Sequence, residues 1–418
     1  MRSRQSLRVR NKGIKMKYLV VLTDGAGDYP IEELGGKTPI EAADIENINA
    51  LAAKGEIGMV KTIPDGIAPG SDAANLSVMG YDPSIYLTGR SPLEAASIGI
   101  EMSDTDVSFR ANLVTLTGDG EYSEFVIADH SSGDISTAEA DELIKAINEE
   151  FQTDEIKFYT GTSYRHCLIV KNGTAKQKLI PPHDILEKKV GEYLPSGENS
   201  EFLRDMMIRS YKILKEHPVN KKRAAEGKNQ ANSLWIWGEG TKPKLKKFFE
   251  RYGITGTAIS AVDLIKGIAI FAGLDSRDVE GATGTVDTNY EGKAAAAIDE
   301  FSKGKDFVYI HLEGPDECSH QGDLKGKLTC LSRIDKIIVD KVHKYLEGCG
   351  EDYKILVVPD HRTPVSLRTH SPEPVPFVLY DSGKDIEFSD EKKYGEKYAE
   401  NGRYFGSGVE LADYFFAG

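Results

Sequence analysis

Three acidic residues each follow an apolar run that is typical of a buried strand. Asp24 ends KYLVVLTD, Asp316 follows DFVYIHLEGP, and Asp360 follows YKILVVP. A carboxylate beside such a run is costly to remove from water unless it meets a cation. Because the carboxyl ends of strands in an open α/β sheet gather at one edge, we expect the three carboxylates to share one site.

Histidines accompany these carboxylates. Asp316 and His320 are four residues apart in DECSH, a spacing that places both on one face of a helical turn. His361 directly follows Asp360, and His370 lies in RTHSPEPVPF. Oxygen and imidazole ligands together suit manganese or zinc, and they also accept magnesium or cobalt. Taken singly, each residue is better interpreted as an ordinary histidine or a helix-capping aspartate, but the repeated context favours a metal site.

Ser71 is the candidate nucleophile. It follows Pro-Gly in IAPGSDAANLSVMG and opens an apolar helical pattern. At a helix N-terminus, free N–H groups and the helix dipole favour a phosphate. A plain helix cap is the alternative interpretation of this loop, since serine is among the preferred N-cap residues. A covalent role for Ser71 therefore depends on the metal site.

Alternating strands and helices predict the fold class, which is a doubly wound α/β domain. Helical spacing that ends near a glycine marks residues 44–55 and 260–274. From about residue 107 to 230 the pattern changes to short alternating strands, an acidic helix and a polar stretch, which indicates a smaller α+β insertion. The segment LWIWGEGTKPK that follows predicts a strand back in the first domain.

These patterns predict three regions. Residues 1–14 are basic and polar and lack the apolar run of a secretory signal, so we expect a disordered basic extension, with translation starting at Met16 as a further possibility. Residues 15–106 and 231–418 form the metal-binding domain. Residues 107–230 form the substrate-binding insertion.

Composition limits the classes of function. The net charge of −14, from 66 acidic and 52 basic residues, leaves no overall basic field for a nucleic-acid backbone. No apolar run reaches the length of a membrane span. The four cysteines form no CxxC pair, which indicates neither a zinc knuckle nor a disulfide framework and favours a reducing cytoplasm. We therefore expect no nucleic-acid or membrane partner, and the oligomeric state stays open.

The motifs DGAGD, PGSDAANLSVMGYDP, TGRSPLEAASIGI, DECSH, PDHRTP and THSPEPVPF occur in this order. The set resembles the archaeal type of cofactor-independent phosphoglycerate mutases, within the alkaline phosphatase superfamily, over nearly the whole chain after Lys15. The resemblance implies an alkaline-phosphatase-like α/β domain interrupted by an α+β insertion. It also implies two divalent metal ions and no 2,3-bisphosphoglycerate. The implied ligands are Asp316, His320 and His370 for one ion and Asp24, Ser71, Asp360 and His361 for the other.

The resemblance further implies a mechanism and a pathway. In such enzymes a serine takes the phosphoryl group from one phosphoglycerate and returns it to the other hydroxyl of the glycerate. Ser71 matches that serine. The implied reaction is the interconversion of 2- and 3-phosphoglycerate in glycolysis and gluconeogenesis.

One segment departs from the family pattern. The archaeal mutases carry an arginine-rich DRRAGRI-like segment where this chain has ADHSSGDIS, so the arginine forks that suit carboxylate and phosphate are missing there. The residues in their place are His130, Ser131, Ser132 and Asp134. His130, Arg165 in GTSYRH and Arg90 in LTGR are candidate substrate-binding residues. ADHSSGDIS is equally well interpreted as a polar turn before a helix whose N-cap is Ser136.

Two alternative functions use the same serine and metals. Together with NSLWIWGEGTKP, the ADHSSGDIS segment resembles a bacterial sub-branch proposed to act as homoserine kinase, in threonine biosynthesis. The expected partner is therefore a small phosphorylated metabolite or an amino acid substrate. A metal-dependent phosphatase is the other alternative, although an insertion large enough to enclose the intermediate argues against transfer to water.

Overall fold

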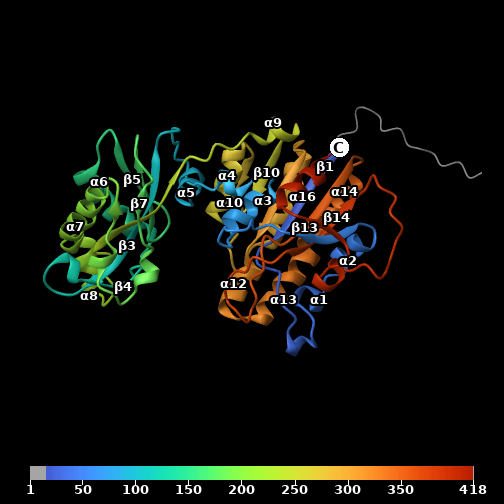
Figure 1. Cartoon of the computed structure of the whole chain (residues 1–418), viewed down its shortest axis with the longest axis horizontal. Helices are drawn as coiled ribbons and strands as arrows, with labels where there is room; N and C mark the ends of the chain where they lie inside the picture. Colours follow the sequence, from blue (N-terminus) through green and yellow to red (C-terminus); the bar gives the residue numbers. More distant parts are fainter. Residues whose placement is uncertain (1–15, 418) are drawn as a thin grey trace, which may run out of the picture. The chain divides into compact units, whose positions relative to one another are not determined.

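The computed structural model describes residues 16–417, so the predicted basic extension at 1–14 lies outside the described residues. The described chain forms two compact units, which are Thr88–Lys244 and the remainder on either side of it. Figure 1 shows that the first unit combines the blue N-terminal part with the yellow-to-red C-terminal part, whereas the second unit is cyan to green. Within 16–417, no helix is long and apolar enough to cross a membrane.

The first unit is built on an eight-stranded sheet in the order β11-β10-β12-β1-β13-β14-β2-β15. All neighbours pair in parallel except for β14, which is antiparallel to both β13 and β2. The strands are β1 (Met16–Thr23), β2 (Glu56–Val60), β10 (Gly256–Ile259), β11 (Asp275–Arg277), β12 (Phe307–Leu312), β13 (Asp352–Val358), β14 (Val375–Asp381) and β15 (Arg403–Phe405).

Helices surround this sheet. The described α-helices of the first unit are α1 (Pro39–Ala42), α2 (Glu46–Ala53), α3 (Ser71–Val78), α4 (Pro83–Tyr86), α9 (Phe248–Tyr252), α10 (Asp263–Ala272), α11 (Tyr290–Ser302), α12 (Gly314–Gln321), α13 (Leu324–Arg333), α14 (Asp340–Gly348), α15 (Glu396–Ala399) and α16 (Gly408–Phe416). A 3₁₀ turn, η1 (Glu32–Leu34), follows β1, and a π-helical segment, η5 (Ile334–Val339), joins α13 to α14. The two helices expected at 44–55 and 260–274 correspond to α2 and α10.

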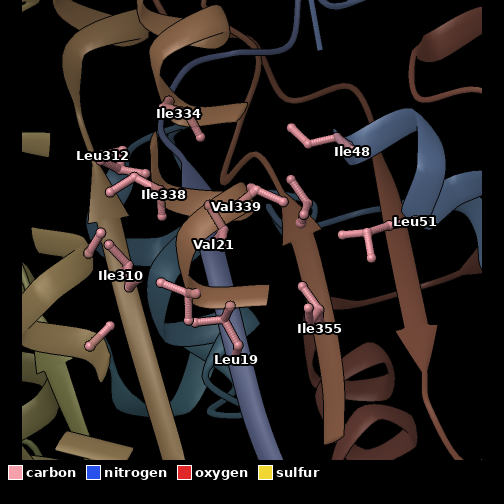
Figure 2. Packing of buried hydrophobic residues seen from close by; sticks show 14 of the residues in the cluster. Leu19, Val21, Ile48, Leu51, Ile310, Leu312, Ile334, Ile338, Val339 and Ile355 are labelled. Carbon is pink, nitrogen blue, oxygen red and sulfur yellow. The ribbon is translucent and has the colours of Figure 1, made fainter. Parts of the chain in front are cut away.

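The central strand β1 shows that helices cover both faces of the sheet. Successive side chains of a strand point to opposite faces. Leu19 and Val21 join the apolar cluster that α2, α11 and η5 also supply, and Figure 2 shows them in that cluster with labelled residues of α2 and η5. Tyr18, on the other face, contacts the rings of Phe415 and Phe416 in α16. The continuous apolar run of β1 is therefore the pattern of a strand buried on both sides, and the doubly wound α/β prediction is confirmed.

The second unit is a smaller α+β structure, as predicted. Its strands are β3 (Val107–Thr117), β4 (Val126–Asp129), β5 (Ile156–Tyr159), β6 (Arg165–Val170) and β9 (Ser233–Thr241), with a separate pair formed by β7 (Gln177–Lys178) and β8 (Ser196–Gly197). Its helices are α5 (Ser91–Ser97), α6 (Thr137–Phe151), α7 (Glu201–Lys215) and α8 (Pro218–Ala225), with 3₁₀ turns η2 (Tyr122–Glu124), η3 (Pro182–Ile185) and η4 (Val190–Tyr193). The five-stranded sheet is antiparallel throughout.

The boundaries of the second unit differ from the prediction. The compact unit is Thr88–Lys244, whereas the sequence pattern places the insertion at 107–230. The prediction that LWIWGEGTKPK returns to the first domain is wrong, because β9 pairs antiparallel with β3. Leu234 and Trp235 of β9 are buried in the core of the second unit, and burial of these large side chains selects that sheet.

Candidate active site

Three neighbouring parallel strands end at the same edge of the first unit's sheet. Thr23 at the end of β1 pairs with Leu312 at the end of β12, and Leu22 pairs with Val358 at the end of β13. Asp24, Asp316 and Asp360 follow these three strands. Each of the seven residues predicted from the metal and serine motifs contacts at least one other member of the set, and the rings of His361 and His370, with centroids 4.0 Å apart, join its two halves. The seven residues are Asp24, Ser71, Asp316, His320, Asp360, His361 and His370.

Asp24, Asp360 and His361 form a fully buried group, here called the buried triad. His361 Nε2 lies 3.6 Å from Asp24 Oδ1 and 3.4 Å from Asp360 Oδ2. Burial and the nearby charge of Asp360 raise the pKa of Asp24 well above its usual range. Asp24 Oδ1 has no hydrogen-bond partner among the described residues. An unpaired buried carboxylate oxygen facing a second carboxylate and an imidazole nitrogen is the donor set of a cation site.

Asp316, His320 and His370 form a second group, here called the outer triad, whose histidines are partly exposed. His320 Nε2 lies 3.2 Å from Asp316 Oδ2, and His370 Nε2 lies 3.5 Å from Asp316 Oδ1. Burial alone would raise the pKa of Asp316, but its hydrogen bonds to the two histidines hold it well below the usual range. The bond to Asp316 raises the pKa of His320 to about 9. The predicted helical spacing is confirmed, since α12 carries both Asp316 and His320.

Ser71, the predicted nucleophile, contacts the buried triad. It is the first residue of α3, and the helix cap is Gly70, which offers no side chain. The Ser71 hydroxyl instead lies 3.2 Å from His361 Nε2. Capping is therefore not the role of this serine, and its hydroxyl lies at the positive end of a helix beside a candidate cation site.

Two polar residues that the sequence patterns did not single out, Asn75 and His311, contact the carboxylates of the buried triad. Asn75, one helical turn after Ser71, donates from Nδ2 to Asp360 Oδ2 at 3.0 Å. His311, on β12, lies with Nε2 2.8 Å from Asp24 Oδ2. Asn75 could have been found from its i+4 spacing to Ser71 on one helix face, whereas nothing in the local sequence marks His311.

Gly25 fits tightly between the two triads. Its backbone is in the left-handed region, with φ of 63°, and its N–H donates to Asp360 Oδ1 at 3.0 Å. A Cβ atom built on it would lie 2.5 Å from Asp316 Oδ1. Both the conformation and the close approach require glycine, which accounts for the Asp-Gly pair at the end of β1.

The two triads offer carboxylate oxygens and imidazole nitrogens, which fit divalent cations such as manganese and zinc. The ligand atoms within each triad lie within 4.8 Å of one another. Without a cation, Asp24 and Asp360 place two carboxyl groups together where water is excluded, which is unfavourable when both are ionised. The arrangement can therefore hold cations next to a serine hydroxyl, a combination suited to phosphoryl transfer.

In the second unit, four aromatic rings adjoin one another in a row, here called the ring cluster. Tyr164 contacts His130, His130 contacts His183, and His183 contacts Trp237, with centroid distances of 5.8, 6.2 and 5.4 Å. Of the predicted substrate-binding residues, His130 is a member of the cluster and Arg165 lies over the ring of Tyr164.

Arginines give the ring cluster a positive field. Arg110 lies over Trp237, with its guanidinium carbon 4.7 Å from the ring centroid. Burial lowers the pKa of His183, and His130, Arg110 and Arg90 lower it further, whereas the carboxylate of Asp184, 3.7 Å from His183 Nε2, raises it. Arg90, the third predicted substrate-binding residue, is thus close enough to act on His183. Arg110, His183 and Trp237 are further candidates that the sequence patterns did not single out; Trp237 lies within NSLWIWGEGTKP, whereas Arg110 and His183 lie outside the quoted motifs.

The segment ADHSSGDIS forms a structured turn. Asp129 accepts hydrogen bonds from the backbone and hydroxyl of Ser131, and the buried Ser132 hydroxyl donates to Leu113 O at 2.9 Å. Ser136 caps α6 by accepting from Glu139 N, as the turn interpretation requires. The two hydroxyls at 131 and 132 are therefore occupied within the protein, and His130 is the residue of this segment that reaches the ring cluster.

Comparison with known proteins gives concordant results. A family model described as 2,3-bisphosphoglycerate-independent phosphoglycerate mutase matches residues 52–220. The 2,3-bisphosphoglycerate-independent phosphoglycerate mutase of Methanosarcina barkeri is 49% identical over 370 residues, covering 88% of this chain and 91% of that protein. Among solved structures, a Pyrococcus horikoshii protein aligns with a TM-score of 0.80 at 29% identity, covering 96% of this chain and 98% of that one. The cofactor-independent phosphoglycerate mutase from Thermoplasma acidophilum aligns with a TM-score of 0.66 at 25% identity, with the same coverage.

Proposed function

The chain belongs to the 2,3-bisphosphoglycerate-independent phosphoglycerate mutase family, and on that premise we propose that it interconverts 2- and 3-phosphoglycerate through a phosphoserine at Ser71. The observation that carries the proposal is the position of Ser71 Oγ, 3.2 Å from His361 Nε2 and at the start of α3. A hydroxyl beside a buried acidic and imidazole group, at the positive end of a helix, suits attack on a phosphate ester.

The reaction consists of two transfers. In the first, a bond forms between Ser71 Oγ and phosphorus while the bond from phosphorus to the glycerate oxygen breaks; Oγ loses its proton and the departing glycerate oxygen takes one up. In the second, the other hydroxyl of the same glycerate forms a bond to phosphorus and loses its proton, while the bond from phosphorus to Oγ breaks and Oγ takes a proton up, so that protons balance over the two steps. Free N–H groups at the start of α3 favour the phosphoryl oxygens in both steps.

We assign the buried triad to one divalent cation and the outer triad to another. The mixed oxygen and imidazole ligands favour manganese or zinc over magnesium or cobalt. When bound, such cations stabilise negative charge on the attacking and leaving oxygens. The chain's own contribution is to hold the ligands rigidly. Asn75, His311 and Gly25 each contact a carboxylate of the buried triad or donate to it from the backbone.

We assign recognition of the glycerate and its phosphate to the ring cluster with His130, Arg165 and Arg90. Arginine guanidinium groups match carboxylate and phosphate, and imidazole N–H groups can donate to the same oxygens. Part of the Arg110 guanidinium group already pairs within the protein, because its Nε donates to Glu94 Oε2 at 2.8 Å. Arg90 and Arg110 lower the pKa of His183 although Asp184 raises it, and two guanidinium groups favour an anionic substrate over the ammonium group of an amino acid.

A direct assay tests the function. The purified full chain is incubated with Mn²⁺ and 3-phosphoglycerate in the absence of 2,3-bisphosphoglycerate, and 2-phosphoglycerate is measured. We expect 2-phosphoglycerate to accumulate to equilibrium, little inorganic phosphate to be released, and phosphate on the peptide containing Ser71 by mass spectrometry.

Parallel reactions separate the alternatives. In the first reaction, homoserine and a nucleoside triphosphate replace the phosphoglycerate. In the second reaction, the protein is incubated with 3-phosphoglycerate and the release of inorganic phosphate is measured. Phosphorylation of homoserine without conversion of 3-phosphoglycerate would refute the mutase proposal in favour of a kinase. Release of inorganic phosphate as the main product would refute it in favour of a phosphatase.

A further inference from the structure

The hydroxyl of Thr363 lies between the two triads and bonds to one residue of each. Thr363 Oγ1 donates to Asp316 Oδ1 at 2.5 Å and lies 3.1 Å from His361 Nδ1. The residue is fully buried, so water does not compete for either contact. One side chain thus joins a member of the outer triad to a member of the buried triad.

Counting protons fixes the direction of these bonds. A threonine hydroxyl has one proton, and an ionised carboxylate can only accept. The Thr363 proton is therefore used on Asp316, and the contact with His361 requires its Nδ1 to carry a proton and donate. Neutral imidazole has one N–H, so Nε2 of His361 is left with a lone pair.

The lone pair on Nε2 is directed at the reacting groups. Nε2 is the atom that contacts Ser71 Oγ at 3.2 Å and lies 3.6 Å from Asp24 Oδ1. In the opposite tautomer, an N–H would point at these atoms, and the imidazole could neither accept the serine proton in a hydrogen bond nor serve as a ligand through Nε2.

Thr363 is itself held rigidly through its backbone. Its N–H donates to Gly27 O at 3.0 Å, and its carbonyl accepts from Lys327 Nζ at 3.0 Å. Lys327 is fully buried and also donates to Asp28 Oδ2 at 2.8 Å. The lysine therefore ties the loop after β13 to the loop after β1 and fixes the backbone that carries the Thr363 hydroxyl, while the contacts to Asp316 and His361 hold the hydroxyl itself.

We propose that Thr363 is a positioning residue that selects the Nδ1-protonated tautomer of His361 while it orients Asp316. A ligand in each triad then depends on one hydroxyl, so that loss of this hydroxyl weakens both. The inference rests on the proposed function for its consequence in metal binding, whereas the tautomer itself is a property of the metal-free chain.

The tautomer is measured in the metal-free full-length protein by ¹⁵N–¹H correlation of its histidine rings, with the His361 signals identified by their loss in His361→Gln. We expect a protonated-type Nδ1 and a pyridine-type Nε2 in the wild type. A wild-type His361 that carries its proton on Nε2 would overturn the proposal, whatever the variants do.

Two substitutions and a matched control separate positioning from packing. Thr363→Val keeps the shape and removes the hydroxyl, and we expect His361 to lose its single tautomer. Thr363→Ser restores the hydroxyl and should restore the pattern. Thr257→Val removes another buried threonine whose hydroxyl donates to a carboxylate, Glu300 Oε2 at 2.8 Å, and should leave His361 unchanged. A serine variant that behaves like the valine variant would show a role for the methyl group in packing and overturn the proposal.

Metal affinity gives the second measurement, by titration calorimetry with Mn²⁺ alone. Loss of a partner that orients a ligand weakens binding by about 10- to 100-fold, and we expect this for Thr363→Val but not for Thr363→Ser. Unchanged affinity in Thr363→Val would refute the coupling to the triads. If the mutase assay fails while the tautomer and affinity results hold, the proposed function is wrong and the role of Thr363 stands.

Discussion

The triads of the first unit and the ring cluster of the second are built in opposite ways. The triads lie where parallel strands end, so the topology of the sheet brings together residues from the two ends of the chain. The ring cluster draws on β9, on η3 and on the loops after β4 and before β6 of an antiparallel unit. Parallel sheets concentrate site residues at one edge, whereas the antiparallel unit collects them from scattered segments.

The two regions also carry opposite charge. The triads contain three buried carboxylates, and burial, followed by the nearby charge of Asp360, raises the pKa of Asp24. Around the ring cluster, burial lowers the pKa of His183 and the charges of Arg110 and Arg90 lower it further, against the opposing charge of Asp184. One region is suited to cations and the other to anions, and in the proposed function this difference separates the chemical step from substrate recognition.

The largest effect is expected from Ser71→Ala. Removing the proposed phosphoryl acceptor should lower kcat for phosphoglycerate interconversion by about 10⁴-fold or more, as for other covalent nucleophiles. Steady-state kinetics measure the loss, with Ser77→Ala as the control. The Ser77 hydroxyl lies on the same helix but accepts from Gly408 N, so this control should keep kcat. A Ser71→Ala enzyme with kcat near that of the wild type would rule out the phosphoserine.

The stability gained from a bound cation should depend on the carboxylates of the triads and not on those of the second unit. Mn²⁺ at 100 times its Kd should raise the free energy of unfolding by about 2.7 kcal/mol, since it binds only the folded state. Asp24→Asn should lose most of this gain in scanning calorimetry. Asp129→Asn, which changes a carboxylate of the second unit, should keep it. Equal responses of the two variants would contradict the assignment of a cation to the buried triad.

A buried histidine should make the second unit sensitive to acid. Burial lowers the pKa of His166 to about 3, and its Nε2 has no hydrogen-bond partner among the described residues. As the pH falls, the unfolded chain binds a proton on His166 before the folded protein does. The free energy of unfolding is therefore highest above the unfolded pKa of about 6.5 and decreases as the pH falls from there toward 3. At pH 5 the loss should reach about 2 kcal/mol.

Tryptophan fluorescence during urea unfolding can follow this loss, because both tryptophans of the chain, Trp235 and Trp237, belong to the second unit. His166→Gln should remove the slope of stability against pH between 6.5 and 5. His217→Gln, at the N-cap of α8, should keep it. A slope that survives in His166→Gln would assign the acid sensitivity to another group.

The smallest effect is expected at the ring cluster. His183→Ala should raise KM for 3-phosphoglycerate by about tenfold, or about 1.4 kcal/mol, while kcat changes by less than about threefold, since it removes binding that ground state and transition state share. Steady-state kinetics separate the two constants. A fall in kcat at constant KM would place His183 with the chemical step and break the division between the two regions.

The sequence alone was sufficient to pick out the carboxylates of the triads and to predict the overall fold. Asp24, Asp316 and Asp360 are recognisable because each follows an apolar run, and parallel strands of known direction end together. The role of Ser71 was ambiguous, since a capping serine and a nucleophile share one local pattern. Only the structure shows that Gly70 occupies the cap position and that the hydroxyl reaches His361.

The remaining residues could not be predicted because their contacts are set by tertiary packing. Thr363 lies within the PDHRTP motif and His311 within a buried strand, but their bonds to Asp316 and Asp24 join residues on other segments and are not visible in the local sequence. The strand containing Trp235 was assigned to the wrong domain, since an apolar run does not specify which of two sheets it joins. His183 lies in a 3₁₀ turn with no periodicity to mark it.

The position of β1 in its sheet has a consequence for synthesis on the ribosome. Both neighbours of β1, β12 and β13, are made long after it, and at ~5–20 residues per second the first of them follows after roughly a quarter of a minute to a minute. The second unit is continuous in sequence and can fold during that interval. We therefore expect the nascent chain to carry an apolar, unpaired β1 for most of its elongation, which makes this strand the natural target for a chaperone that shields emerging polypeptides.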